Sequence, residues 1–187
     1  MKIKRTYILL LLAVGAFSFF LGTILFANKP SKDTPEPDTK TITTFEITDT
    51  SGRTLNLEQL NGQNKLILIN LWASWCAPCI EEFPRLLDLA EAYKDNLVFI
   101  ALSSDIEQTD MQKFLEKQQI TSKDNRYIAL DKASHITTNI FKAKGLPNTY
   151  LIDPELKIRY HLKGGKWETE TLENQIKMLL GSIENAS

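Results

Sequence analysis

Two cysteines are the residues best suited to do chemistry in this chain of 187 residues. Cys76 and Cys79 are its only cysteines, and two residues separate them. A disulfide between them would close almost no loop, so it could add little stability by restricting the unfolded chain. A pair at this spacing can instead perform exchange, because one thiolate attacks a substrate disulfide and the other resolves the mixed disulfide. The spacing predicts thiol–disulfide exchange, with Cys76 as the nucleophile and Cys79 as the resolving cysteine.

The surrounding sequence indicates that Cys76 stands at the start of a helix. Residues 65–72 form a near-continuous apolar run, which predicts a strand buried on both faces. Apolar residues then recur at helical spacing from Phe83 to Tyr93. Pro78 is compatible with this start, because the first turn of a helix does not need its N–H. The unpaired N–H groups and the dipole at a helix N-terminus would favour the reactive thiolate of Cys76.

Around this centre the sequence predicts alternating strands and helices. Residues 43–48 and 54–57 predict a strand pair, and Thr109 with Gln112 predicts a capping box at the start of a helix. The order of the elements indicates an α/β fold with a mixed sheet covered by helices. The other predicted strands are 97–102, 126–130, 148–152 and 157–161, and the other predicted helices are 134–141 and 172–183.

Two segments resemble the thioredoxin superfamily, and within it the TlpA/ResA/CcmG-like membrane-anchored reductases. The first is the strand LILINLW with the motif WASWCAPC at residues 72–79, and the second is GLPNTYLID at residues 145–153. The resemblance extends over about residues 42–187, where the predicted strands and helices follow one another in the order typical of this family. It implies a thioredoxin-like fold with a mixed central sheet flanked by helices, an N-terminal strand pair and a central helix–strand insertion. It also implies a cis peptide bond before Pro147, which would lie against the cysteine pair.

Glu82 is a candidate for proton transfer at the cysteine pair. It follows Cys79 by three residues, so both lie on one helix face, and it matches a glutamate that tunes the cysteines in ResA-like proteins. We hypothesise that Glu82 carries the proton for Cys79; the alternative is a solvated helix acid like Glu81. Asn70 stands where thioredoxins usually carry a buried aspartate, and an amide cannot accept that proton.

Substrate contacts are predicted at four residues around the pair. Trp75 adjoins Cys76 and would border the exposed site, as aromatic residues often line recognition surfaces, whereas Trp72 is predicted to be a core residue. The dipeptide Ala77-Pro78 lacks the histidine of strongly oxidising relatives, which favours a reductant. Leu146 directly precedes Pro147 in the second matching segment.

The N-terminal part of the chain predicts a membrane anchor. Residues 7–27 carry no charge and would span roughly 31 Å as a helix at 1.5 Å per residue, and three basic residues precede them. A cleaved signal peptide is the alternative, but Leu25 is too large for its cleavage site. The following residues are polar and rich in proline, as in an extended tether. The predicted organisation is a transmembrane anchor over residues 1–27, a flexible linker over 28–41 and a thioredoxin-like domain over 42–187 on the extracytoplasmic side of a single-pass cell-membrane protein.

The net charge and the small number of possible metal ligands argue against some classes of binding partner. The net charge is −1, and because the first 27 residues hold +3, residues 28–187 hold −4, which argues against nucleic acid binding. A structural zinc site needs four ligands, and His135 and His161 are not at ligand spacing. We therefore expect no metal and no organic cofactor beyond the cysteine disulfide. Ala73 replaces the Thr or Ser three residues before a peroxiredoxin nucleophile, which disfavours a peroxidase.

Two alternatives to a reductase stay open from the sequence. One is a disulfide oxidase or isomerase, which differs in redox potential, and the other is a Cu(I)-handling thioredoxin-like module, since soft thiolates bind Cu(I). For a reductase, the resemblance implies disulfide-bearing exported proteins as substrates, with apocytochrome c as one candidate. It also implies a membrane-embedded electron donor that keeps the cysteines reduced in an oxidising compartment.

Overall fold

The computed structural model describes residues 40–185, and a five-stranded mixed sheet runs through them. The three parallel strands are neighbours, and the last two strands add to them in antiparallel pairing. This is the thioredoxin-like α/β fold expected from the sequence. In spatial order the strands are β5 (Arg126–Leu130), β4 (Leu97–Ser103), β3 (Leu66–Trp72), β6 (Asn148–Ile152) and β7 (Ile158–Lys163).

The predicted membrane anchor lies outside the described residues, as does the predicted linker up to residue 39. Within residues 40–185, no helix has the length and apolar character needed to cross a membrane. Lys40 and Thr41 already pair with the start of β7, because the Ile158 N–H donates to the Lys40 carbonyl and Thr41 bridges to Lys157. Pairing with the sheet thus begins two residues before the predicted boundary at 42.

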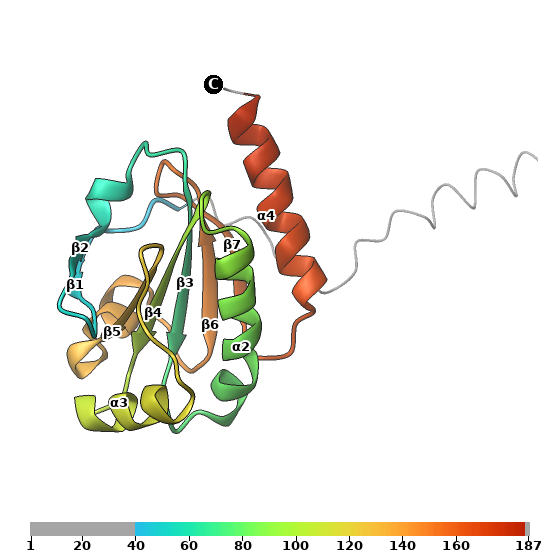
Figure 1. The fold of residues 1–187 in the computed structure, drawn as a ribbon. Helices are drawn as coiled ribbons and strands as arrows, with labels where there is room; N and C mark the ends of the chain where they lie inside the picture. The colour runs from blue at the N-terminus through green and yellow to red at the C-terminus, as the bar shows by residue number, and fades with distance from the viewer. Residues whose placement is uncertain (1–39, 186–187) are drawn as a thin grey trace, which may run out of the picture. The chain divides into compact units, whose positions relative to one another are not determined.

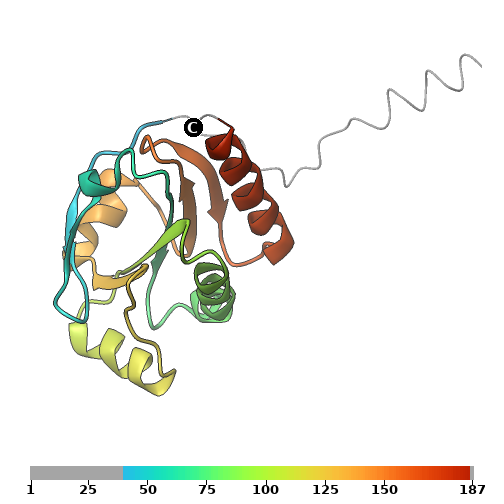
Figure 2. The same ribbon diagram turned by 45° about the horizontal axis from the view of Figure 1, so that its top comes forward.

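Different elements cover the two faces of the sheet (Figures 1 and 2). Helices α2 and α4 cover one face with α3 at its edge, while the β1–β2 hairpin and the segment between β5 and β6 cover the other. All residues of β3 and β4 are consequently buried. The covering elements are α2 (Ala77–Ala92), α3 (Gln108–Lys117), α4 (Thr169–Glu184), β1 (Glu46–Thr48), β2 (Thr54–Asn56), the 3-10 turns η1 (Leu57–Leu60) and η2 (Lys132–Ser134), and the π-helical turn η3 (Ile136–Ile140).

Side chains of β3 alternate between two cores. Leu66, Leu68 and Trp72 pack with the cluster beneath α2 and α4. Ile67 and Ile69 pack with the cluster beneath the hairpin. The period of two explains why the sequence shows an unbroken apolar run here, since each face needs its own apolar residues.

One local prediction is wrong, and another is confirmed with different bounds. Helix α3 begins at Gln108 after Glu107, without a side-chain cap, so Thr109 lies inside the first turn and forms no capping box. The short helix predicted over 134–141 is present as the π-helical turn η3, which begins two residues later and follows the separate turn η2. Asp131 explains the later start, because its carboxylate accepts hydrogen bonds from the N–H groups of Ile136 and Thr137 at 2.8 and 2.7 Å.

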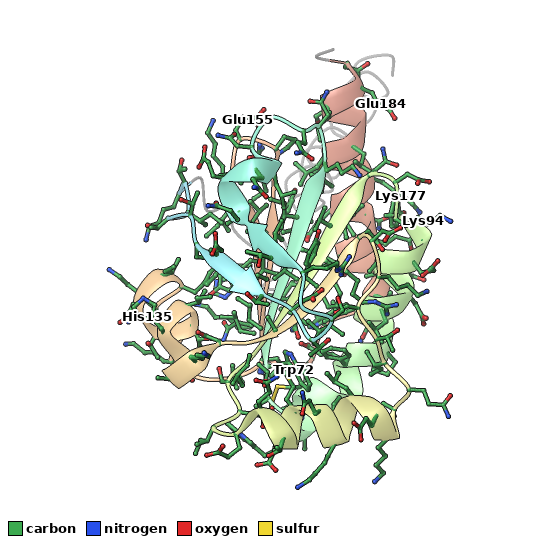
Figure 3. All side chains as sticks on the ribbon, turned by 60° about the vertical axis from the view of Figure 1, so that its left-hand side comes forward. Trp72, Lys94, His135, Glu155, Lys177 and Glu184 are labelled. Atoms are coloured by element: carbon green, nitrogen blue, oxygen red, sulfur yellow. A yellow bond between two sulfur atoms is a disulfide. The ribbon has the colours of Figure 1, made fainter. Side chains whose placement is uncertain are left out.

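The ends of three central strands meet at one edge of the sheet. The register pairs Leu71 with Asn148 and Trp72 with Ser103. The segment that follows β3 and the segment that precedes β6 therefore lie at this same edge. Figure 3 shows the disulfide beside Trp72 at this end of the molecule, with Lys94 toward the other end.

Candidate active site

The two cysteines form a disulfide at the start of α2. The S–S distance is 2.02 Å and the Cα atoms lie 5.2 Å apart. Cys76 is the N-cap residue of α2, and the N–H of Ile80 donates to its carbonyl at 3.1 Å. Cys76 is 6% exposed, whereas Cys79 is fully buried. Of the two cysteines, only Cys76 keeps contact with solvent, and their roles as nucleophile and resolving cysteine stay a prediction.

A buried aspartate holds the loop that leads into Cys76. Asp105 accepts hydrogen bonds from the Ser74 N–H at 3.0 Å and from the Ser74 hydroxyl at 2.7 Å. Ser103 at the end of β4 donates its hydroxyl to the same carboxylate. Because Ser74 directly precedes Trp75 and Cys76, these bonds fix the approach of the chain to the helix start. The sequence analysis missed this role of Asp105.

Glu82 is fully buried on the inner face of α2, whereas its neighbour Glu81 is exposed. The alternative of a solvated helix acid is therefore excluded. Its Oε1 atom accepts from the Asn70 amide at 2.7 Å, and its Oε2 atom accepts from the Trp167 indole N–H at 2.7 Å. The Thr149 hydroxyl also donates to Oε1 at 3.5 Å, so the carboxyl is held by an amide, an indole and a hydroxyl.

Burial dominates the electrostatics of this carboxyl. Loss of solvation raises the pKa of Glu82 above its ordinary value. The hydrogen bonds from Trp167 and Asn70 act in the opposite direction without cancelling the rise. The raised pKa favours the protonated form of the Glu82 carboxyl, and perturbed carboxyls of this kind are often found at functional sites.

The segment between β7 and α4, residues 164–168, packs across α2 and is called the strap below. Arg85 on α2 donates to the carbonyls of Trp167 at 2.8 Å and of Gly165 at 3.2 Å. Its guanidinium also lies over the Trp167 ring, 4.4 Å from the centroid. Gly165 packs directly on the motif, since a Cβ there would come within 2.9 Å of the Pro78 carbonyl oxygen. The strap thus connects the backbone between the cysteines to the donor that holds Glu82.

The peptide bond between Leu146 and Pro147 is cis, as the resemblance implied. Pro147 is buried, and its carbonyl accepts from the Gly164 N–H at 2.9 Å. Leu146 is half-buried and packs against the core cluster that contains both cysteines. The predicted site residues of the two matching segments therefore converge on one edge of the sheet.

The remaining predicted contact residues lie at the surface around Cys76. Trp75 is 67% exposed, and Ala77 and Pro78 are exposed as well. Trp72 is fully buried and packs against Phe83 at 4.6 Å between ring centroids, so it is a core residue as predicted. The surface around the nucleophile is thus mainly apolar, and its role in substrate contact stays a prediction.

Comparisons with known proteins agree with this geometry. The model of the AhpC/TSA family matches residues 39–161. The chain belongs to the AhpC/TSA family. Thiol-disulfide oxidoreductase ResA of Geobacillus thermodenitrificans (strain NG80-2) is 30% identical over 183 residues, which cover 97% of this chain and 95% of the relative. ResA of Bacillus subtilis (strain 168) is 28% identical over 159 residues, which cover 82% and 80%.

A solved structure extends the likeness to three dimensions. The crystal structure of a protein described as thiol:disulfide interchange protein DsbE, from Chlorobium tepidum, matches with a TM-score of 0.66 and 26% identity. The match covers 78% of this chain and 99% of that one. Within its family the chain is accordingly a thiol–disulfide oxidoreductase of the ResA/DsbE type, with the Cys76–Cys79 disulfide as its redox-active group.

Three site residues escaped the sequence analysis. Trp167 and Arg85 meet across 82 positions of sequence, and no local pattern connects them. The contact between Asp105 and Ser74 could have been predicted from the sequence. Each residue lies two positions after the end of its strand, β4 or β3, and the ends of adjacent parallel strands meet at one edge of the sheet.

Within residues 40–185, no group of three or more His, Cys, Asp or Glu side chains is placed to hold a metal ion.

Proposed function

We propose that this protein reduces disulfides in exported proteins on the extracytoplasmic side of a cell membrane. The observation that carries the proposal is the cysteine pair at the start of α2, backed by the buried carboxyl of Glu82. The family supports disulfide-bearing proteins as substrates, since the curated relatives are named thiol-disulfide oxidoreductases. Apocytochrome c is the substrate that we propose first.

The reaction begins from the dithiol. The Cys76 thiolate attacks one sulfur of the substrate disulfide, forms a mixed disulfide and releases the other substrate sulfur as a thiolate, which takes a proton from solvent. Cys79 loses its proton to the ionised Glu82 carboxyl and attacks the Cys76 sulfur, and the second substrate sulfur leaves as a thiolate that is also protonated by solvent. Two electrons have then passed to the substrate, and the protein is left with the Cys76–Cys79 disulfide that the structure shows.

Turnover requires a reductant, because exported proteins meet an oxidising environment. We propose a membrane-embedded electron donor that returns two electrons to the disulfide, and an uncleaved anchor at residues 7–27 that keeps the domain near it. No metal or organic cofactor takes part in this scheme. The length and apolar composition of residues 7–27 support the anchor.

The reduction potential tests the direction of transfer. We would equilibrate the full chain in thiol–disulfide buffers at pH 7 and measure the oxidised fraction. A potential near or below about −230 mV is expected, in the range of thioredoxin-type reductants. A value near about −120 to −180 mV would instead identify an oxidase or isomerase. Cys79→Ser should in addition trap substrates on Cys76 as mixed disulfides in cells, and its double variant with Cys76→Ser should trap none.

A further inference from the structure

A cleft of about 520 Å³ opens beside Pro147, on the β7 side of the active site. Its walls come from the segment after η3, from the start of β6 and from the end of β7. The cleft contains no residue of the cysteine motif, and the sequence analysis did not single it out. The residues that line it are Phe141, Lys142, Ala143, Lys144, Gly145, Leu146, Pro147, Asn148, Tyr150, His161, Lys163 and Gly164.

A short path of contacts joins the cleft to the cysteines. Pro147 and Gly164 line the cleft and are hydrogen-bonded to each other at 2.9 Å. The next residue, Gly165, packs on the carbonyl of Pro78, which lies between the two cysteines. Tyr150 and Phe141 pack with the core beneath the hairpin, whereas the cysteines belong to the core beneath α2 and α4, so the cleft and the cysteines meet across the end of the sheet. A polypeptide whose disulfide reaches Cys76 would pass over this edge to place its flanking residues in the cleft.

The cleft is basic. Three of its lining residues are lysines with exposed side chains, and none of its lining residues, all of them described, is an acid. The ion pairs found within residues 40–185 involve other basic residues, and Lys142, Lys144 and Lys163 take part in none of them. This cluster stands out because residues 28–187 together carry −4.

The floor of the cleft has a fixed shape. The Tyr150 and His161 rings are stacked at 4.1 Å between centroids, and Phe141 packs on Tyr150 at 4.5 Å. The Asn148 side chain accepts from the His161 Nε2–H at 2.7 Å and donates to the Gly145 carbonyl. These contacts join the backbone segments that carry the lysines into a preformed hollow, which limits the ordering required of the backbone when a ligand binds.

We propose that this cleft binds an acidic stretch of the substrate polypeptide next to its disulfide. The inference rests on the proposed function, because it names the kind of protein disulfide that the site prefers. Carboxylates in the cleft would lie near three ammonium groups, and the aromatic floor would contact the apolar part of the same segment. Attraction of this kind mainly raises the rate of encounter and falls with added salt.

The test compares two peptides with the same internal disulfide. One carries three glutamates on each side of the disulfide and the other carries three glutamines. The rate at which the reduced full chain, in neutral detergent, reduces each peptide is measured first. Each rate is then divided by the rate at which dithiothreitol reduces the same peptide, which corrects for the effect of the glutamates on the reactivity of the peptide disulfide. We expect the acidic peptide to react roughly three- to tenfold faster at low salt, with the preference lost at about 0.5 M NaCl.

Two matched triple variants locate the effect. Lys142→Gln, Lys144→Gln and Lys163→Gln together should abolish the preference. Lys65→Gln, Lys94→Gln and Lys157→Gln change the net charge equally, but they lie at the opposite ends of β3, α2 and β6, and should retain it. Should the first triple variant unfold, single substitutions at its three positions carry the test, each lowering the preference by roughly 1.5- to twofold.

The outcomes separate the two proposals. Equal normalised rates in the wild type, or a preference that survives removal of the cleft lysines, would overturn the cleft assignment. Reduction of hydroxyethyl disulfide, which is small and uncharged, should be unchanged in both triple variants. A wild-type protein that reduces neither peptide nor hydroxyethyl disulfide would refute the proposed function instead.

Discussion

The Glu82 carboxyl titrates in surroundings that disfavour its charge. Burial raises its pKa above the ordinary value of 4.5, so the folded protein retains a proton there that the unfolded chain has already lost. Between the two pKa values the folded state binds more protons than the unfolded state. The free energy of unfolding must then fall as pH rises through this window, by at most about 1.4 kcal/mol per pH unit, and level off above the folded pKa.

Glu82→Gln should remove this slope. We expect the difference in unfolding free energy between the wild type and the variant to fall from pH 4.5 upward, measured by urea denaturation of the oxidised protein. In the reduced protein, the same substitution should change the pH dependence of thiol reactivity. Trp167→Phe keeps the carboxyl but removes the donor to its Oε2 atom, so the pKa of Glu82 should rise further and the fall should extend to higher pH from the same starting point. Parallel stability curves for the wild type and Glu82→Gln would contradict the raised pKa.

At the scale of single residues, sequence reasoning succeeds where chemistry is local. The Cys76–Cys79 spacing and the place of Glu82 one helical turn later follow from helix geometry alone. Trp167 could not be predicted, because its hydrogen bond to Glu82 depends on how the strap after β7 crosses α2. The cis bond before Pro147 came from the family resemblance, since sequence alone does not distinguish it from the usual trans form.

At the scale of elements, close packing of the strap on α2 depends on one glycine. A Cβ at Gly165 would lie 2.9 Å from the Pro78 carbonyl oxygen and 3.2 Å from its Cβ atom, and neither can move without shifting the cysteine motif. We expect Gly165→Ala to destabilise the oxidised protein by about 1–3 kcal/mol through overpacking. It should also slow the reduction of hydroxyethyl disulfide, because the motif and the strap move together.

Gly181 provides the matched control. It lies in α4, where an added Cβ meets open space. Gly181→Ala should stabilise the protein by about 0.5–1 kcal/mol, because alanine loses less backbone entropy in a helix. Thermal or urea unfolding of the two variants measures both effects. A Gly165→Ala variant as stable as the wild type would show that the strap is free to move away from Pro78.

The order of elements was predictable because each carries its own periodicity, as in the apolar run of β3. Their starts and ends were less predictable where a distant or side-chain interaction decides them. Asp131 sets the start of η3 after β5, and Glu107 rather than Thr109 precedes α3. The basic cleft could not be predicted from the sequence for the same reason, because Lys142 and Lys163 are brought together only when β6 pairs with β7.

At the scale of the whole molecule, redox state and folding stability are linked. The folded and unfolded chains, each oxidised or reduced, form a thermodynamic cycle. The cysteine pair has one reduction potential in the folded chain and another in the unfolded chain. For every 30 mV by which the folded value is the lower, the free energy of unfolding of the oxidised protein exceeds that of the reduced protein by about 1.4 kcal/mol. A reductant should therefore be more stable when oxidised, whereas a strong oxidant is more stable when reduced.

Urea unfolding of the full chain in its two redox states measures this difference directly. We expect the oxidised protein to unfold at higher urea, by an amount that matches the measured potential. The double variant Cys76→Ser and Cys79→Ser cannot form the disulfide and should unfold at one urea concentration under both conditions. Since the cycle must close, a reduced form more stable than the oxidised form would require the Cys76–Cys79 pair to act as an oxidant, whatever its family.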